Sequence, residues 1–88
     1  MNLIWITKAK YVDDFKIELE FNDGINGIVD LEDSLDAEIY NPLKNINYFK
    51  NFKKNAWTIE WDCEVDFSPE YLYELTIKQL KNKTQIKV

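Results

Sequence analysis

A segment that contains glycine joins two alternating runs of the chain: Phe21-Asn22-Asp23-Gly24-Ile25-Asn26-Gly27-Ile28-Val29-Asp30-Leu31. Apolar and polar residues alternate before and after its centre, which is the period-two pattern of half-buried strands. A two-residue loop would place polar side chains opposite apolar ones, because a one-residue slip exchanges the two faces of a strand. A loop of Asn22-Asp23-Gly24 instead keeps one face apolar and predicts a β-hairpin.

The chain contains only two glycines, and both lie in this segment. In a three-residue hairpin loop the last residue adopts a left-handed conformation, which Gly24 adopts without steric cost. In the same register Ile25 faces Phe21 and Gly27 faces Leu19. The missing side chain at Gly27 would make room for a bulky side chain from another layer.

The hairpin is preceded by residues 3–12, which are rich in β-branched and aromatic side chains. Strict alternation would place Trp5, Thr7, Ala9 and Tyr11 on one face and Ile4, Ile6 and Val12 on the other. A tight turn at residues 12–15 would then complete a three-stranded antiparallel meander over residues 3–31.

The middle of the chain is less regular. Residues 30–35 are compatible with a short helical turn, and Asn41-Pro42 is a turn or helix-start signal. The apolar residues between positions 43 and 52 predict one or two turns of helix.

Strict alternation returns at Trp57 and continues to Phe67, which predicts a strand with both Trp57 and Trp61 on its core face. One straight strand of this length would span roughly 36 Å, whereas a domain of this size is only about 30 Å across. We therefore expect a bend at residues 62–64. We also expect the strand Trp57–Trp61 to join the meander.

A helix is predicted to begin at Ser68-Pro69-Glu70, with Ser68 as N-cap and Glu70 complementing the helix dipole. Its buried stripe would be Tyr73, Ile77 and Leu80, flanked by Leu72 and Thr76. Residues 81–88 are predicted to be a frayed tail, or an edge strand formed by Ile86 and Val88. The expected fold is a single α+β domain over residues 1–88, with an antiparallel meander of about 4–5 strands, a short middle helix and a C-terminal helix on one face.

The composition excludes several classes of site. The chain has no histidine, and all 11 of its basic residues are lysines. Imidazole-based catalysis and imidazole-ligated metal sites are therefore excluded, and no arginine can bind a phosphate or guanine in bidentate fashion. With a net charge of −5, we expect no direct binding to nucleic acid or membrane. The single cysteine, Cys63, cannot form an internal disulfide, which indicates a cytoplasmic protein.

Four carboxylates share the polar face of the second alternating run: Glu60, Asp62, Glu64 and Asp66. They lack the spacing of an EF-hand, and like charges on an exposed strand commonly serve solvation and protect an edge from aggregation. We expect no catalytic, cofactor or metal site, and we regard these four residues as a candidate interaction surface for a protein partner. The sequence is also compatible with a homo-oligomer.

Other readings compete with this one. Asp66 and Glu70 could serve as the acid–base pair of a small-molecule-binding protein or carboxylate-based enzyme, although turn formation and helix capping explain them more simply. The three tryptophans, Trp5, Trp57 and Trp61, could be core or interface residues. Four lysines interleaved with aromatic residues between positions 44 and 54 superficially resemble a nucleic-acid patch, but a solvated face suits the acidic chain better.

Two blocks together resemble a widespread bacterial family known as domain of unknown function 2442. The matching residues are Phe21, Asp23, Gly24, Val29, Asp30 and Leu31 in the first block, and Trp61, Asp66, Pro69, Glu70, Leu72 and Tyr73 in the second. The sequence departs from the family at Asp62-Cys63-Glu64, where the family usually turns with an Asn-Gly-like pair.

The resemblance implies a small cytosolic α+β protein without assigned activity, in which these residues have structural roles. It also implies a partner, because such proteins are often encoded beside another small protein in an arrangement like a toxin–antitoxin or regulatory pair. We therefore expect a non-enzymatic protein-interaction module, the antitoxin-like or regulatory member of such a pair. An acidic patch would steer a basic partner, and the edge strand at residues 3–12 would supply specific contacts by strand addition.

Overall fold

The hairpin at residues 22–24 has the predicted register in a computed structural model, which describes residues 3–85. Strand β2 (Lys16–Phe21) pairs antiparallel with β3 (Asn26–Asp30), and Ile17 lies opposite Val29. The Phe21 N–H donates to the Ile25 carbonyl at 2.9 Å, and Gly24 has φ +92°. Both the loop length and the left-handed glycine are confirmed.

Strand β1 (Ile6–Asp13) pairs with β2, which gives a three-stranded sheet in the order β1-β2-β3. The register shifts between Ile6 and Lys8, so that Ile6 faces Phe21 while Ala9 faces Leu19. The predicted division of faces in β1 is therefore wrong. A β-bulge inserts one residue and moves Ile6 to the core face, together with Ala9 and Tyr11.

The second alternating run forms a separate sheet instead of joining the meander. Its strands are β4 (Lys53–Lys54), β5 (Ile59–Trp61) and β6 (Val65–Asp66), in the order β4-β5-β6. The sheets meet where the Ile6 N–H donates to the Trp57 carbonyl at 2.9 Å. The predicted bend at residues 62–64 is confirmed, and so is the α+β class, with six strands in two sheets among residues 3–85.

Trp57 was predicted to lie in the core, and this is wrong. The Asn55 side-chain oxygen accepts hydrogen bonds from the N–H groups of Trp57 and Thr58, both at 2.8 Å, and holds the chain in a turn. Strand alternation therefore begins only at Ile59, and the Trp57 side chain is 55% exposed. Trp61 is buried as predicted.

Short helices connect the two sheets. They are the 3-10 helices η1 (Glu32–Leu35) and η2 (Glu38–Lys44) and the single-turn helix α1 (Ile46–Phe49). Pro42 lies inside η2, and Asn45 caps α1 by accepting from the N–H groups of Asn47 and Tyr48. The helix predicted between positions 43 and 52 is thus present as two short pieces, η2 and α1, and the helical turn expected at residues 30–35 is η1.

The C-terminal helix α2 (Pro69–Gln85) begins as predicted, because the Ser68 hydroxyl accepts from the Tyr71 N–H at 3.0 Å. Its most buried residues are Leu72 and Thr76, whereas Tyr73, Ile77 and Leu80 are only partly buried or exposed. The buried face of the helix is therefore rotated about the helix axis relative to the prediction. The helix also extends beyond residue 81, where a frayed tail was expected. The edge strand expected at Ile86 and Val88 falls outside the described residues.

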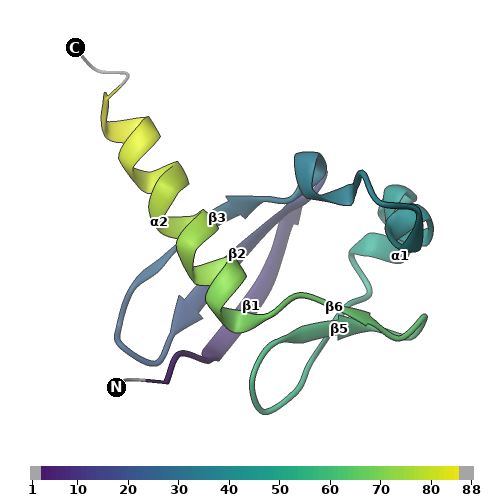
Figure 1. Ribbon diagram of the computed structural model, residues 1–88, viewed down its shortest axis with the longest axis horizontal. Helices are drawn as coiled ribbons and strands as arrows, with labels where there is room; N and C mark the ends of the chain where they lie inside the picture. The colour runs from purple at the N-terminus through teal and green to yellow at the C-terminus, as the bar shows by residue number, and fades with distance from the viewer. Residues whose placement is uncertain (1–2, 86–88) are drawn as a thin grey trace.

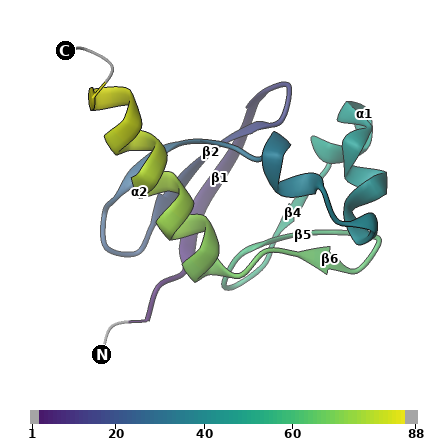
Figure 2. The same ribbon diagram turned by 45° about the horizontal axis from the view of Figure 1, so that its top comes forward.

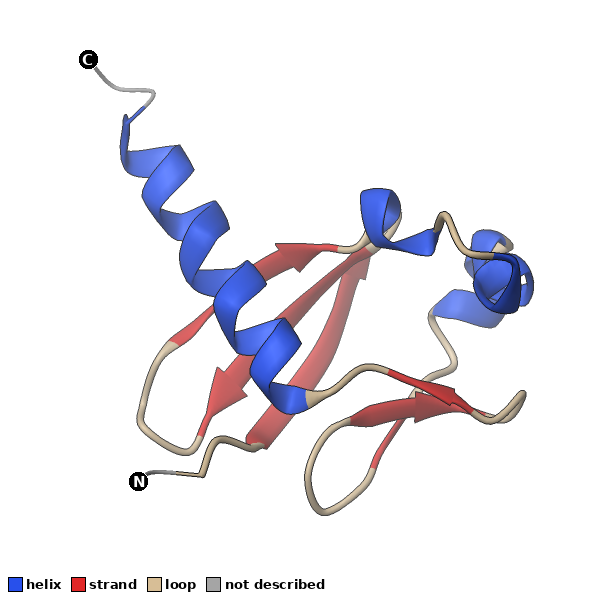
Figure 3. Cartoon of the chain, viewed as in Figure 1, coloured by secondary structure: helices blue, strands red, loops and turns tan. Residues whose placement is uncertain are grey.

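Helix α2 lies across the first sheet, and the second sheet lies beside the first one (Figures 1 and 2). Gly27 permits this contact: a Cβ built there would come within 3.1 Å of Thr76 Cγ2 and 3.3 Å of a Leu80 methyl group. The predicted role of Gly27 is therefore confirmed. Strands and helices together enclose one core (Figure 3), to which both sheets contribute, with Leu19, Phe21, Phe49, Ile59, Trp61 and Leu72 among its buried residues.

Candidate functional site

The four predicted interaction carboxylates lie on one small hairpin, the β5–β6 unit of the second sheet. Glu60 and Asp66 are direct cross-strand partners, while Asp62 and Glu64 stand in the connecting turn. Together they line an open hollow of about 390 Å³. The structure therefore brings the four residues together as the alternation predicted, and we call this surface the acidic hairpin.

Few cations balance the acidic hairpin. The Lys53 ammonium lies 3.1 Å from an Asp62 carboxylate oxygen, and both side chains are largely exposed. The Asn55 amide donates to a Glu60 carboxylate oxygen at 2.9 Å. Glu60 and Asp66 remain opposite each other as like charges, an arrangement that destabilises a strand pair.

The turn of the acidic hairpin is also unfavourable locally. The Glu64 N–H donates to the Trp61 carbonyl at 3.0 Å, which closes a three-residue loop. Glu64 then occupies the left-handed position with φ +66°. A residue with a Cβ is strained in this conformation, which glycine adopts freely.

The alternative enzymatic pair, Asp66 and Glu70, is not assembled into a site. Both residues are exposed, and the hollow that Asp66 lines is formed by residues 60–62 and 64–66, without Glu70. Within residues 3–85 no group of three or more histidine, cysteine, aspartate or glutamate side chains is placed to hold a metal ion. Ser68 and not Asp66 caps α2.

The two blocks of the family resemblance meet at the tip of the β2–β3 hairpin. The Tyr73 hydroxyl donates to an Asp23 carboxylate oxygen at 2.5 Å, and the other Asp23 oxygen accepts from the Ile25 N–H at 3.0 Å. The Tyr73 ring also packs edge-on against Phe21, with centroids 5.1 Å apart. These contacts join the hairpin to the first turns of α2.

The same contacts change two pKa values. The hydrogen bond from Tyr73 is the main cause that lowers the pKa of Asp23, and the Ile25 N–H adds to it. The same bond raises the pKa of Tyr73. Both groups are on the surface, and their interaction orients the hairpin.

Asp30 has a related position at the end of β3. The Gln79 side chain accepts from the Asp30 N–H at 2.9 Å and donates to the Asp30 carbonyl at 3.1 Å. One amide thus covers the backbone at this edge of the first sheet, as a neighbouring strand would. The Asp30 carboxylate accepts from the Glu32 N–H at 2.9 Å and starts η1.

The three tryptophans have different environments. Trp61 is 2% exposed, and its indole N–H donates to the Phe49 carbonyl at 2.8 Å. Trp5 is half-buried and packs edge-on against the exposed Trp57, with centroids 5.9 Å apart. Trp61 is therefore a core residue, while Trp57 is accessible to a partner.

The lysine and aromatic segment at residues 44–54 does not form a stacking surface. Lys44, Lys50, Lys53 and Lys54 are exposed, whereas Phe49 is fully buried and Phe52 packs against Trp61. Cys63 is half-buried, and its interaction with the Tyr48 hydroxyl raises the pKa of that tyrosine. The aromatic rings thus serve the core.

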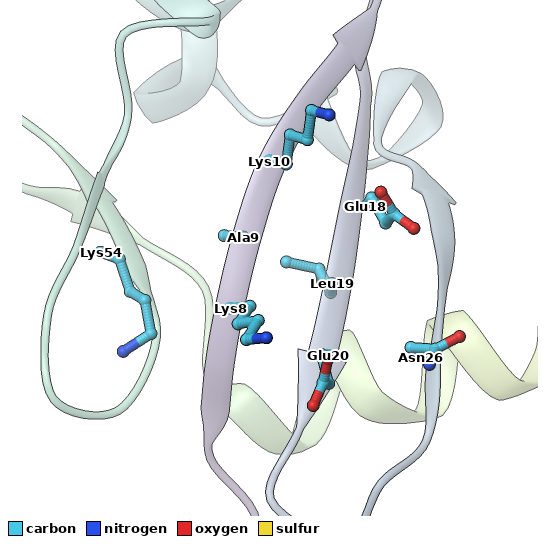
Figure 4. Close-up of a pocket in the computed structure, with 8 residues that line it drawn as sticks. All are labelled: Lys8, Ala9, Lys10, Glu18, Leu19, Glu20, Asn26 and Lys54. Carbon is cyan, nitrogen blue, oxygen red and sulfur yellow. The ribbon is translucent and has the colours of Figure 1, made fainter.

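The sequence did not predict a second hollow, of about 610 Å³, beside β1 (Figure 4). We call it the β1 groove. Lys54 of β4 lines one side of it, and the other side is lined by residues of all three strands of the first sheet: Lys8, Ala9 and Lys10 of β1, Glu18, Leu19 and Glu20 of β2, and Asn26 of β3. The two lysines Lys8 and Lys10 are the sequence feature that could have indicated an exposed edge here, because lysines are common on edge strands. Their proximity to Lys54 depends on how the two sheets pack.

No helix among residues 3–85 is long and apolar enough to cross a membrane. Comparisons with curated proteins and with solved structures found no match. A family model described as "protein of unknown function (DUF2442)" matches residues 6–78, which include both blocks that meet at the Asp23–Tyr73 contact. The chain therefore belongs to this family of proteins of unknown function.

Proposed function

We propose that the protein is a non-enzymatic protein-interaction module of the cytoplasm that captures a basic partner with its acidic hairpin. The observation that carries the proposal is the pairing of Glu60 with Asp66 across β5 and β6. Like charges that face each other reduce stability, and so does a glutamate in a left-handed turn. A hairpin with only a structural role has no need of either feature.

The charge distribution supports a role in association. Lys53 is the one lysine ion-paired to the acidic hairpin among residues 3–85. A local excess of negative charge steers a cationic partner and raises its association rate more than its final affinity. The antitoxin-like or regulatory role within a two-protein pair is part of the proposal and rests on the family resemblance.

The test uses tagged chain purified from its native host, in parallel with a variant in which Glu60→Gln, Asp62→Asn and Glu64→Gln are combined. We expect the parent to bring down a basic protein and the variant to recover it several-fold less well at low salt. Measured with the purified partner, the variant should associate more slowly and depend less on ionic strength, because charge steering is screened by salt.

A matched control removes three exposed carboxylates elsewhere, by Glu32→Gln, Asp33→Asn and Glu38→Gln. This variant has the same net charge as the first and should capture the partner like the parent. Equal association rates for the parent and the acidic-hairpin variant, at both low and high ionic strength, would reject the proposal. Recovery of the parent chain alone under gentle conditions would also count against it.

A further inference from the structure

The outer edge of β1 has unpaired backbone groups, which follows from the register of the first sheet. The hydrogen bonds from Phe21 N–H to Ile25 and from Leu31 N–H to Phe15 show that odd-numbered residues of β2 bond towards β3. The even-numbered residues Glu18 and Glu20 therefore bond towards β1, where their partners are Lys10 and Lys8.

By the same alternation, the backbone N–H and C=O groups of Ala9 and Tyr11 point away from β2. No strand among residues 3–85 pairs with this edge, since the sheet order is β1-β2-β3. The opposite edge of the sheet differs, because the Gln79 amide covers the backbone of Asp30 there.

The β1 groove adjoins this open edge on the side of β4 and extends from there over the face of the first sheet as far as β3. At one end the Ile6 N–H is bonded to the Trp57 carbonyl, which joins the two sheets. Across the groove stands Lys54 of β4, itself an edge strand of the second sheet. A single extended segment can enter a space bounded in this way, whereas a strand that carries its own sheet would meet β4.

The two strands that flank the groove contribute only lysines as charged lining residues. Lys8 and Lys10 come from β1 and Lys54 from β4 (Figure 4). The lining glutamates, Glu18 and Glu20, come from β2 and are the direct cross-strand partners of Lys10 and Lys8. Within residues 3–85 no ion pair engages any of these three lysines. With three lysines and two glutamates, the lining of the groove has a small excess of positive charge in a chain whose net charge is −5, and Lys54 has no glutamate opposite it in the first sheet.

We propose that the β1 groove binds an extended segment of a protein partner whose side chains alternate between acidic and apolar. Its backbone pairs with Ala9 and Tyr11, as in strand addition. Its carboxylates lie on the side of Lys8, Lys10 and Lys54, and its apolar side chains lie on the side of Ala9 and Tyr11, because successive side chains of a strand point to opposite faces. The inference rests on the proposed function only in taking a protein as the ligand.

A second copy of the chain fits this edge less well. Lys8 and Lys10 share one face of β1, so a two-fold antiparallel pairing centred on Lys8, Ala9 or Lys10 places a lysine opposite a lysine. Directly opposed like charges destabilise a strand pair. An acidic segment instead finds opposite charges on both sides of the groove.

The test measures fluorescence anisotropy of labelled eight-residue peptides titrated with the full chain. One peptide alternates glutamate with valine, a second alternates lysine with valine, and a third has the glutamates and valines in separate blocks. We expect the alternating acidic peptide to bind at least tenfold more tightly than either of the others, with an affinity that falls as salt is raised.

Two variants locate the binding. The first variant combines Lys8→Gln, Lys10→Gln and Lys54→Gln, and it should bind the acidic peptide at least tenfold more weakly. The control variant combines Lys44→Gln, Lys50→Gln and Lys78→Gln, which remove the same charge from other exposed positions. Its affinity for the peptide should differ from that of the parent by less than twofold. Ala9→Pro removes an outward N–H and should abolish binding, while edge strands tolerate proline and circular dichroism should show a native fold.

Equal affinity of the parent and the groove-lysine variant, or no preference for the alternating acidic peptide, would overturn the inference. A concentration-dependent dimer in sedimentation that Ala9→Pro abolishes would assign the edge to a second copy and would also overturn it. These results are independent of the proposed function, because loss of peptide binding leaves partner capture by the acidic hairpin unchanged.

Discussion

The β2–β3 and β5–β6 hairpins share one loop design but differ in what occupies it. Each has a three-residue loop that ends in a left-handed residue, which is Gly24 in the first and Glu64 in the second. The tip of the first hairpin is held by a hydrogen bond between Asp23 and Tyr73. The second presents carboxylates at its tip and has like charges in opposition, so its sequence is less favourable for stability.

The difference shows that the two hairpins depend on different sources of stability. The first has long strands, a glycine where the backbone needs one, and a tyrosine from α2 at its tip. The second has strands of only three and two residues. It is held mainly by Trp61, whose ring is buried against Phe49 and Phe67.

The largest expected effect is therefore at Trp61. The substitution Trp61→Ala should destabilise the protein by about 3–5 kcal/mol, because it removes a large buried ring and leaves a cavity. Chemical denaturation followed by circular dichroism measures this change. Trp57→Ala is the control and should cost about 1 kcal/mol or less, since that ring is mostly exposed. Similar losses for the two variants would show that Trp61 does not anchor the second hairpin.

Exchanging the loop residues tests the comparison directly. Gly24→Ala should cost about 1–2 kcal/mol, because alanine is strained at positive φ. Glu64→Gly should instead stabilise the protein by about 0.5–1 kcal/mol, since it relieves the same strain and the greater freedom of the unfolded glycine offsets part of the gain. Thermal or urea unfolding measures both. Changes of the same sign at the two positions would contradict the shared loop geometry.

The smallest expected effect concerns pH. The pKa of Asp23 is lowered in the folded protein by the Tyr73 hydroxyl and the Ile25 N–H. Its contribution to stability is therefore complete above the unfolded pKa of 3.8 and is lost as the pH falls through the lower, folded value. In the variant Tyr73→Phe, the loss of folding stability that comes from protonation of Asp23 should be smaller, because the variant lacks the hydroxyl that lowers the pKa of Asp23. Melting temperatures measured from pH 7 to pH 2 give the result, and parallel curves for parent and variant would count against the contact.

The structural features that could be predicted were local ones. The loop at residues 22–24, the bend at residues 62–64 and the start of α2 at Ser68 all depend on neighbouring residues. Turn type, strand alternation and N-cap chemistry act over a few positions, so they can be read from the chain. The grouping of the four carboxylates on one hairpin was predictable for the same reason.

Other features interrupted simple alternation or depended on contacts between distant segments. The bulge in β1 reversed the face of Ile6, and an asparagine-capped turn exposed Trp57, although simple alternation had predicted otherwise. The β1 groove also needs two sheets to pack side by side. Periodicity in a sequence gives the orientation of side chains along one uninterrupted strand, and it carries no information about a bulge, a late strand start or the neighbouring sheet.

Local patterns in the chain were therefore sufficient to predict the α+β class, the register of the first hairpin and the position of the acidic residues. Long-range packing sets the division of the strands within residues 3–85 into two sheets, the contact of Asp23 with Tyr73 across fifty positions of sequence, and the open edge of β1 beside Lys54. The two groups of features differ in the distance along the chain over which the interactions that produce them act. Backbone preferences and capping act within a few residues, whereas sheet partnership depends on which apolar faces can be buried together.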